Sequence, residues 1–279
     1  MAVPKAAVIG AGPMGRWLAR HLTSMGYQVK MFDKNTKLLK ELAVGRKISP
    51  ANSLDEAIRD SQIVALAVGA RNAARLIKQI IPRITGKTLV DVSSVKTPVV
   101  NALKQTDVKN NLILLVHPLF GPAARHLEDK TVLLAVYKNR RAEYRTCKEL
   151  FSPSRIQIMS PKEHDLKMAA AMALTRILLL TMFDIWRKKS VENLVFSQKA
   201  LRLAASTILT ESSSLISEIV TDNPYTTRIL RETLRKIQSV KINPARALEA
   251  IREESPKPVL TESYTEIYRL LEKLEAKNK

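Results

Sequence analysis

Apolar and polar positions change their spacing repeatedly through the first 159 residues, and each change marks a boundary between predicted elements. Short apolar runs, each suited to a strand buried on both faces, occupy residues 6–9, 27–32, 63–68, 88–92, 112–116, 131–137 and 155–159. Stretches with helical spacing separate them at residues 17–22, 34–42, 53–58, 73–81 and 142–151. This alternation predicts an α/β fold with a doubly wound parallel sheet.

The pattern changes near Ser160-Pro161, after which almost no strand signal remains. Apolar positions then recur at helical spacing over residues 166–186, 191–209, 213–220, 226–237, 244–251 and 264–274. Asn223-Pro224 and Pro256-Lys257-Pro258 interrupt these helices as turns. We therefore predict an α/β domain over residues 1–159 and an all-helical domain over residues 160–279.

A glycine-rich turn joins the first strand to the following helix, with the sequence Gly10-Ala11-Gly12-Pro13-Met14-Gly15. Gly10 permits a tight turn, Gly12 lets backbone N–H groups approach a pyrophosphate, and Gly15 lets the helix pack closely on the strand. The N-terminus of the helix, with Pro13 and Met14, offers N–H groups and the positive end of the helix dipole to the phosphates. We predict that these residues bind a dinucleotide and that residues 1–159 form a dinucleotide-binding domain.

An acidic residue, Asp33, ends the second strand at nearly the spacing from Gly15 at which a carboxylate binds the adenosine ribose of NAD. An acid there repels the 2′-phosphate of NADP, so we expect NAD rather than NADP as the cofactor. The nearby Lys34 and Lys37 soften this preference. We expect Val68, at the end of the next predicted strand, to line the same site.

Composition narrows the class of protein. No uninterrupted run of about eighteen apolar residues predicts a transmembrane helix. The single cysteine, Cys147, cannot form an internal disulfide, and no Cys or His cluster has the spacing of a zinc site. Because residues 1–5 lead directly into the first strand, we expect no signal peptide. We therefore predict a cytoplasmic protein that holds no metal and does not associate with a membrane.

The formal net charge of +20 at pH 7 is concentrated in the first domain, which holds 26 Lys and Arg residues against 11 Asp and Glu residues. Such a field attracts an anionic cofactor and substrate, or nucleic acid. The basic residues are scattered, with few aromatic residues between them and no helix-turn-helix or RNA-binding signature. A solvated basic surface is therefore our expectation, rather than a nucleic-acid site.

Side chains suited to the oxidation of an alcohol follow two central strands. Ser94 and Lys96 follow the strand over 88–92, and His117 follows the strand over 112–116. Ligands of open parallel sheets bind beyond the carboxyl ends of the strands, so these groups should lie near the nicotinamide. His117 is suited to accept the hydroxyl proton while hydride leaves the same carbon, and Ser94 to orient the hydroxyl or fix the imidazole tautomer.

Other polar residues are expected to have structural roles. His21 lies within a predicted helix and His126 in a polar loop. Asp165 opens the helical domain, where we expect a first-turn acid that interacts favourably with the helix dipole.

Four short motifs together resemble the prephenate dehydrogenase family of tyrosine biosynthesis: GAGPMG at 10–15, DVSSVK at 91–96, HPLFGP at 117–122 and EHD at 163–165. The acidic end of the second strand fits the same pattern. FSQKALRLA at 196–204 and LISEIVTDNPYT at 215–226 resemble the helical segments of that family. The likeness covers roughly residues 5–240, and HPLFGP is its most specific part.

The resemblance implies an oxidoreductase that carries out NAD-dependent oxidative decarboxylation of prephenate to 4-hydroxyphenylpyruvate. His117 would accept the hydrogen bond or the proton of the ring hydroxyl, Ser94 would assist it, and Lys96, in the same motif, would also serve catalysis. A long apolar helix such as the one over 168–183 is usually a buried core element, and in two-domain enzymes of this layout it is also often a dimer seam. We therefore expect a homodimer formed through the helical domain.

The chain departs from the family pattern after EHD, where the family carries a Gln or Ser and then a second His. Met172 and Arg176 stand at those positions. Prephenate carries two carboxylates, which arginine binds in bidentate geometry. Arg176, Arg202 and Arg228 are the candidates for these contacts, although Thr207 aligns as naturally as Arg202 with the family's arginine.

Three alternatives to a prephenate dehydrogenase stay open. The substrate is arogenate, which has an amine where prephenate has a ketone, or the chain is a related hydroxyacid or imine dehydrogenase. The third alternative is a protein without catalysis that senses a dinucleotide and holds nucleic acid on its basic domain. Because a sensor needs neither Ser94 nor His117, their presence argues against this alternative.

Overall fold

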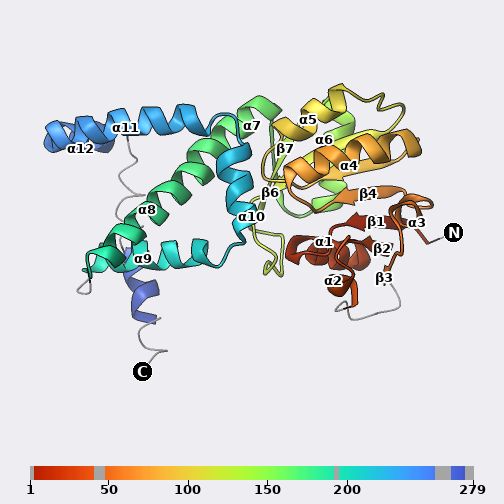
Figure 1. Ribbon diagram of the computed structural model, residues 1–279, viewed down its shortest axis with the longest axis horizontal. Helices are drawn as coiled ribbons and strands as arrows, with labels where there is room; N and C mark the ends of the chain where they lie inside the picture. The colour runs from red at the N-terminus through yellow and green to blue at the C-terminus, as the bar shows by residue number, and fades with distance from the viewer. Residues whose placement is uncertain (1–2, 41–47, 192–194, 255–264, 274–279) are drawn as a thin grey trace. The chain divides into compact units, whose positions relative to one another are not determined.

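The computed structural model describes residues 3–40, 48–191, 195–254 and 265–273. The chain forms two compact units (Figure 1). Unit 1 comprises Met1–Met168 with Ser217–Pro224, and unit 2 comprises Ala169–Ile216 with Tyr225–Lys279. The sequence pattern predicts a single boundary between residues 159 and 160, whereas unit 1 continues further and includes a short segment that returns from the helical half.

An eight-stranded sheet forms the centre of the described part of unit 1, in the order β3-β2-β1-β4-β5-β6-β7-β8. Its strands are β1 (Lys5–Ile9), β2 (Gln28–Phe32), β3 (Ile48–Pro50), β4 (Ile63–Leu66), β5 (Thr88–Asp91), β6 (Leu112–Pro118), β7 (Thr131–Ala135) and β8 (Arg155–Met159). Neighbouring strands run parallel, except that β6 and β7 are antiparallel. The predicted doubly wound sheet is confirmed, with this antiparallel pair and the short β3 as additions.

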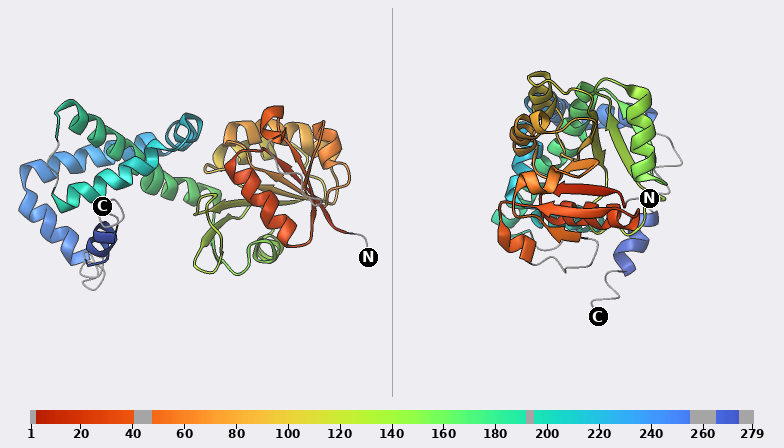
Figure 2. Two further views of the ribbon diagram at one scale, coloured as in Figure 1. Left: turned by 90° about the horizontal axis from the view of Figure 1, so that it is seen from below. Right: turned by 90° about the vertical axis from the view of Figure 1, so that its right-hand side faces the viewer.

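Helices cover both faces of this sheet (Figure 2). They are α1 (Pro13–Ser24), α2 (Thr36–Lys40), α3 (Leu54–Ile58), α4 (Ala70–Ile80), the short η1 (Ile81–Arg83), α5 (Thr97–Lys104) and α6 (Arg140–Phe151). Val8 of β1 packs into one core with α1 and α6, while the next residue, Ile9, packs into the other with α3, α4 and α5. Successive side chains of a strand point to opposite faces, so strands buried on both faces give the continuous apolar runs of the sequence.

Local signals set the starts of two of these helices. The side chain of Ser53 accepts a hydrogen bond from the N–H of Glu56 at 3.1 Å and so caps α3. The apolar pattern does not predict α5, although Pro98 in its first turn is a typical start signal. The helix predicted over 34–42 begins at Thr36, and its predicted end lies outside the described residues.

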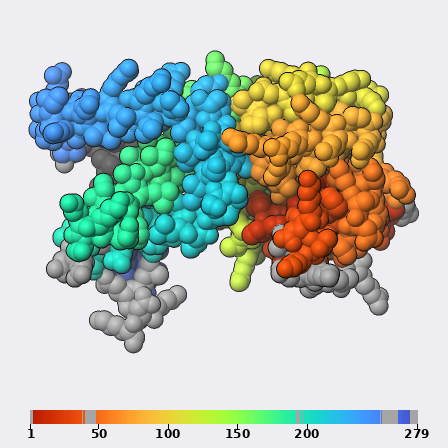
Figure 3. Space-filling model, viewed as in Figure 1, coloured from red at the N-terminus to blue at the C-terminus, as the bar shows by residue number. Residues whose placement is uncertain are grey.

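Two further elements complete unit 1: α7 (Pro161–Met168) and the π-helical segment η3 (Glu218–Asp222). Segment η3 lies against α4, and the surfaces of the two segments meet in the space-filling view (Figure 3). An ion pair joins Asp222 of η3 to Arg71 of α4. The returning segment Ser217–Pro224 therefore belongs structurally to the sheet domain, although the chain reaches it through the helices of unit 2.

Unit 2 is helical in its described residues, as the second half of the sequence predicts. Its elements are η2 (Ala169–Ala173, π-helical), α8 (Leu174–Lys188), α9 (Phe196–Leu209), most of α10 (Ser213–Ser217), α11 (Thr226–Ile242), α12 (Pro244–Glu254) and a helix over 265–273. A small apolar core around Leu179, Ala205 and Ile208 joins α8 to α9. The turn predicted at 256–258 lies outside the described residues.

One helix of the described chain, Pro161–Lys188, is long and apolar enough to cross a membrane by length and composition. Its most apolar window has a mean hydropathy of 1.7, and 28% of that window is buried. The lack of an uninterrupted apolar run in the sequence therefore does not exclude such a segment. The helix also carries Arg176, whose guanidinium forms an ion pair with Glu211.

Candidate active site

The turn between β1 and α1 has the geometry that its glycines predict. Gly10 has a φ of +111°, a conformation that residues with a Cβ rarely adopt. A Cβ on Gly15 would lie 1.9 Å from the carbonyl oxygen of Gly10, so only glycine lets α1 approach the strand this closely. At Gly12, by contrast, a Cβ would meet no atom within 4 Å, which leaves this face of the turn open.

The surroundings of this turn fit a bound dinucleotide. No side chain among the described residues caps the N-terminus of α1, where Pro13 is exposed and Met14 is half-buried. The carboxylate of Asp33 at the end of β2 accepts the N–H of Ala11 at 2.7 Å, which fixes it beside the turn. Val68, after β4, packs beside the turn, its Cγ1 2.9 Å from where a Cβ on Gly10 would lie. An open glycine, an uncapped helix end and an oriented carboxylate are the features that hold a pyrophosphate and an adenosine ribose.

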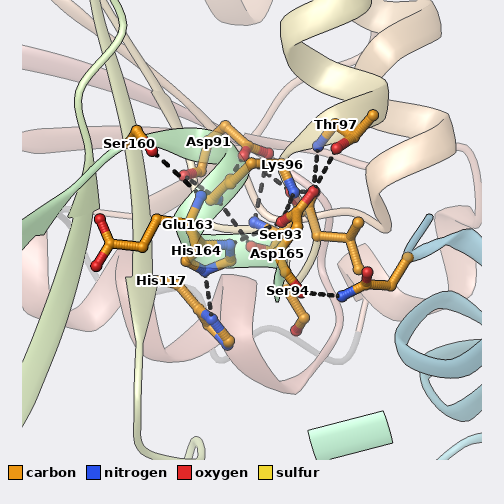
Figure 4. Close-up of polar contacts among 12 residues, drawn as sticks. Asp91, Ser93, Ser94, Lys96, Thr97, His117, Ser160, Glu163, His164 and Asp165 are labelled. Atoms are coloured by element: carbon orange, nitrogen blue, oxygen red, sulfur yellow. Dashed lines mark hydrogen bonds and ion pairs between the residues drawn. The ribbon is translucent and has the colours of Figure 1, made fainter. Parts of the chain in front are cut away.

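A chain of three buried side chains lies at the carboxyl end of β6 (Figure 4). Nδ1 of His117, on β6, lies 3.0 Å from Nε2 of His164, on α7. Nδ1 of His164 lies 2.8 Å from Oδ1 of Asp165. The Asp165 carboxylate also accepts the backbone N–H groups of Lys96 and Thr97 and the hydroxyl of Thr97, at 2.6 to 2.8 Å.

The hydrogen bonds that link His117, His164 and Asp165 determine which imidazole nitrogens carry protons. Burial alone would raise the pKa of Asp165, but the hydrogen bonds from His164, Thr97 and Lys96 hold that pKa below its ordinary value. Burial lowers the pKa of His164, and its hydrogen bond to Asp165 offsets this only in part. Neutral His164 therefore donates from Nδ1 to the carboxylate and accepts at Nε2. His117 then donates from Nδ1, which makes its Nε2 the basic nitrogen.

Lys96 is fully buried behind these groups. Its ammonium lies 2.6 Å from Oδ2 of Asp91, 2.8 Å from the carbonyl oxygen of Ser93 and 2.7 Å from the carbonyl oxygen of Val116. The lysine thus links the end of β5 to the end of β6, directly before His117. Its three N–H donors are directed at these protein oxygens, so its contacts are those of a group that positions the two strand ends.

Ser94 is half-buried at the end of β5, and its backbone N–H donates to Oε1 of Glu218 at 3.1 Å. Glu218 comes from the returning segment and is 7% exposed. Burial raises the pKa of Glu218 to about 7, partly opposed by the hydrogen bonds from Ser94 and Ala70. Asn223, from the same segment, donates to the carbonyl oxygen of Asp165 at 2.7 Å.

The three candidate arginines all lie in unit 2. Arg176 is largely buried, and Glu211 binds one edge of its guanidinium in bidentate geometry, with Nε–Oε2 at 2.9 Å and Nη2–Oε1 at 2.6 Å. Arg202 is exposed on α9. Arg228 is exposed on α11 and donates to Glu232 at 3.0 Å.

The sequence interpretation of Asp165 as a helix-dipole acid is wrong, because this residue is buried and bound to α5 and His164. The first-turn acid of α7 is Glu163. His164 was not predicted as a site residue, although the EHD motif contains both His164 and Asp165 and was a usable signal. His21 bonds to the carbonyl oxygen of Leu150 and stacks on Trp17, a structural role. Among the described residues, no group of three or more His, Cys, Asp or Glu could hold a metal ion.

A family model described as the NAD binding domain of 6-phosphogluconate dehydrogenase matches residues 5–154. The chain belongs to this family. The dinucleotide-binding fold and NAD as its cofactor, both predicted from the sequence, are thereby confirmed.

The family model ends at residue 154, but comparisons with single relatives show a similarity that extends into the helical half of the chain. The "Probable arogenate/prephenate dehydrogenase" of Methanocaldococcus jannaschii is 24% identical over 252 residues, covering 87% of this chain and 55% of the relative. The crystal structure of prephenate dehydrogenase from A. aeolicus with hydroxyphenyl propionate and NAD⁺ is 16% identical, with a TM-score of 0.71, covering 100% of this chain and 98% of that one. For Synechocystis arogenate dehydrogenase the identity is 18%, the TM-score 0.56 and the coverage 98% of both chains.

These likenesses confirm the resemblance to prephenate dehydrogenases that the sequence motifs indicate. The two solved structures agree with this chain in fold. The chain spans about half the length of the curated relatives it matches.

Proposed function

We propose that this protein is an NAD-dependent dehydrogenase that oxidises and decarboxylates prephenate, with arogenate as the alternative substrate. The observation that carries the proposal is the hydrogen-bonded chain of His117, His164 and Asp165 at the end of β6. It presents a basic imidazole nitrogen at the edge of the sheet where a dinucleotide binds. Ser94, at the end of the neighbouring strand, adds a hydroxyl at the same edge.

The proposed reaction begins when Nε2 of His117 accepts the proton of the hydroxyl on the substrate ring. NAD, when bound, accepts hydride from the carbon that carries this hydroxyl. The ring then loses its carboxylate as carbon dioxide, and the electrons of the broken bond make the ring aromatic. His117 returns the proton to the phenolate oxygen, giving 4-hydroxyphenylpyruvate from prephenate or tyrosine from arogenate.

The other residues support this proton transfer. His164 and Asp165 hold His117 in the tautomer that has Nε2 as the acceptor. Ser94 orients the substrate hydroxyl, and Lys96, which the sequence led us to expect in catalysis, positions the ends of β5 and β6. A general base of this kind typically contributes about 10²- to 10⁴-fold to the rate.

We propose Arg202 and Arg228 for the substrate carboxylates ahead of Arg176. Glu211 already binds the Nε–Nη2 edge of Arg176 in bidentate geometry, and Nη1 of Arg176 donates to the carbonyl oxygen of Met172. Arg202 and Arg228 are exposed, and within the described part of the chain Arg228 donates to one carboxylate, that of Glu232. Alanine variants of each arginine should separate these roles. Loss of an arginine that binds a substrate carboxylate should raise KM for the substrate without changing the affinity for NAD.

The experiment that tests the function is NADH formation by the purified protein, followed at 340 nm, with four pairs of reactants. Prephenate and arogenate are each supplied with NAD or NADP. Turnover of either substrate with NAD supports the proposal and identifies the substrate. Tight NAD binding without turnover of either substrate would contradict it and favour a related hydroxyacid or imine substrate.

We also propose a cytoplasmic homodimer formed through the helical unit. Large apolar side chains are exposed on the described helices of unit 2, among them Ile185, Leu234, Ile237, Ile242 and Ile251. Exposed apolar side chains in such number are typical of a protein interface. Light scattering of the purified protein at several concentrations tests the proposal, and a monomer throughout would contradict it.

Nucleic acid is not among the partners we propose, despite the net charge of +20 at pH 7. Binding to DNA by surface lysines and arginines weakens steeply as salt rises. Retention on a DNA column at physiological salt would contradict this view and revive the sensor alternative.

A further inference from the structure

Glu218 stands at the edge of the sheet where the nicotinamide half of a dinucleotide binds. In the doubly wound fold, one mononucleotide is held by the β1–β2 half and the other by the half that contains β4, β5 and β6. Asp33, which suits the adenosine ribose, ends β2. Glu218 contacts the segments that follow β4 and β5, because Oε1 accepts the N–H of Ser94 and Oε2 would lie 2.6 Å from a Cβ on Gly69.

The carboxylate of Glu218 is held by groups without a full charge. Its hydrogen bonds come from the backbone N–H groups of Ser94 and Ala70. The proposed proton transfer uses His117, His164 and Asp165, and it gives Glu218 no role.

Charged side chains at the end of β5 and just after it act on Glu218. Asp91, at the end of β5, raises the pKa of Glu218, and Lys96, which pairs with Asp91, lowers it. Arg71 on α4 is engaged with Asp222 of η3 itself. The opposite effects of Asp91 and Lys96 leave burial as the main influence, so Glu218 exchanges its proton near pH 7, where its pKa lies at about 7.

We propose that Glu218 is the specificity-determining carboxylate that makes this site bind the oxidised nicotinamide more tightly than the reduced one. The oxidised ring carries a positive charge and the reduced ring carries none. An ionised carboxylate at this edge therefore stabilises the first and gains nothing from the second. The inference rests on the proposed function, since it concerns the form of NAD that a dehydrogenase must take up.

The same electrostatics link cofactor binding to a proton. A positive ring beside Glu218 favours the ionised carboxylate, so binding of NAD⁺ near pH 7 releases a proton that binding of NADH does not release. The proton release can be measured without any turnover of a substrate.

The experiment is calorimetric titration of the purified full chain with NAD⁺ and with NADH, for the wild type, Glu218→Gln and Asp222→Asn. The glutamine has the size of the glutamate and keeps an acceptor oxygen for the backbone N–H of Ser94. Asp222→Asn is the matched control, because it removes a carboxylate from the same segment at its contact with Arg71.

At pH 8.5 we expect Glu218→Gln to lower the preference for NAD⁺ over NADH about tenfold, while Asp222→Asn leaves it unchanged. At pH 7, titrations in buffers of different ionisation enthalpy should show proton release on NAD⁺ binding in the wild type and none in Glu218→Gln. An unchanged preference and unchanged proton release in Glu218→Gln would overturn the inference and leave the proposed function standing. A wild type that binds neither NAD⁺ nor NADH would overturn the proposed function as well.

Discussion

Asp165→Asn removes the negative charge at the end of the hydrogen-bonded series Asp165, His164 and His117, and it changes few atoms. The carboxylate accepts four hydrogen bonds, from the N–H groups of Lys96 and Thr97, the hydroxyl of Thr97 and Nδ1 of His164. An asparagine offers one oxygen and one NH₂ group. In either orientation, the NH₂ group faces at least one backbone N–H and leaves buried donors without acceptors.

The substitution changes which ring nitrogens of His164 and His117 carry protons. If the amide NH₂ takes the place of Oδ1, it donates to Nδ1 of His164, and His164 then carries its proton on Nε2. His164 now donates to Nδ1 of His117, so His117 holds its proton on Nε2 and loses the basic nitrogen at that position. We expect kcat to fall by roughly 10²- to 10⁴-fold. We also expect the free energy of unfolding to fall by about 2 to 4 kcal/mol, because charge-assisted hydrogen bonds are lost.

The assay combines NADH formation at 340 nm with chemical denaturation and NAD titration. Thr97→Val is the matched control, since it removes one hydrogen bond to the same carboxylate and leaves His164 untouched. Its stability should fall by about 1 kcal/mol with kcat within a fewfold of the wild type. The reasoning is refuted if folded, NAD-binding Asp165→Asn keeps a wild-type kcat, or if Thr97→Val loses as much activity.

Three further predictions concern binding and stability. Lys96→Met leaves Asp91 buried without its cation and should lower the free energy of unfolding by about 3 to 5 kcal/mol in urea denaturation; a loss below about 1 kcal/mol would contradict the positioning role. Gly12→Ala should have the melting temperature of the wild type but bind NAD at least about tenfold more weakly. Gly15→Ala should bind NAD more weakly and also melt at a lower temperature. Equal melting temperatures of the two variants would argue against the loop geometry. Because the folded pKa of Glu218 lies above its ordinary value of 4.5, its protonation favours the folded state, so this contribution is present below pH 4.5 and is lost as the pH rises through about 7. The wild type should therefore lose about 3 kcal/mol relative to Glu218→Gln between these pH values, and parallel stability profiles would contradict the raised pKa.

The features that the sequence predicts well are local in the chain. The glycine turn, the capping box at Ser53 and the apolar strands depend on neighbouring residues, and each appears as predicted. His117 was predicted as a site residue because a general rule places ligands beyond the carboxyl ends of parallel strands. Helix α5 was missed because its apolar spacing is short, although Pro98 marks its start.

The features that the sequence does not reveal depend on long-range contacts. Asp165 resembles a helix-start acid until α5 supplies the backbone N–H groups that it binds, which come from residues far earlier in the chain. In the sequence, Arg176 resembles a residue that binds a substrate carboxylate. In the structure it is paired with Glu211, which lies 35 residues later in the chain. Glu218 carries no motif that predicts its contact with Ser94, because the segment that contains it rejoins unit 1 only after passing through unit 2.

The central claim is that His117 is the base of an NAD-dependent dehydrogenase, and His117→Ala tests it most directly. With whichever of prephenate or arogenate the wild type oxidises, kcat of the variant should fall by at least about a hundredfold, while its affinity for NAD stays within a fewfold of the wild type. A folded variant that binds NAD and turns over the substrate at the wild-type rate would contradict the account.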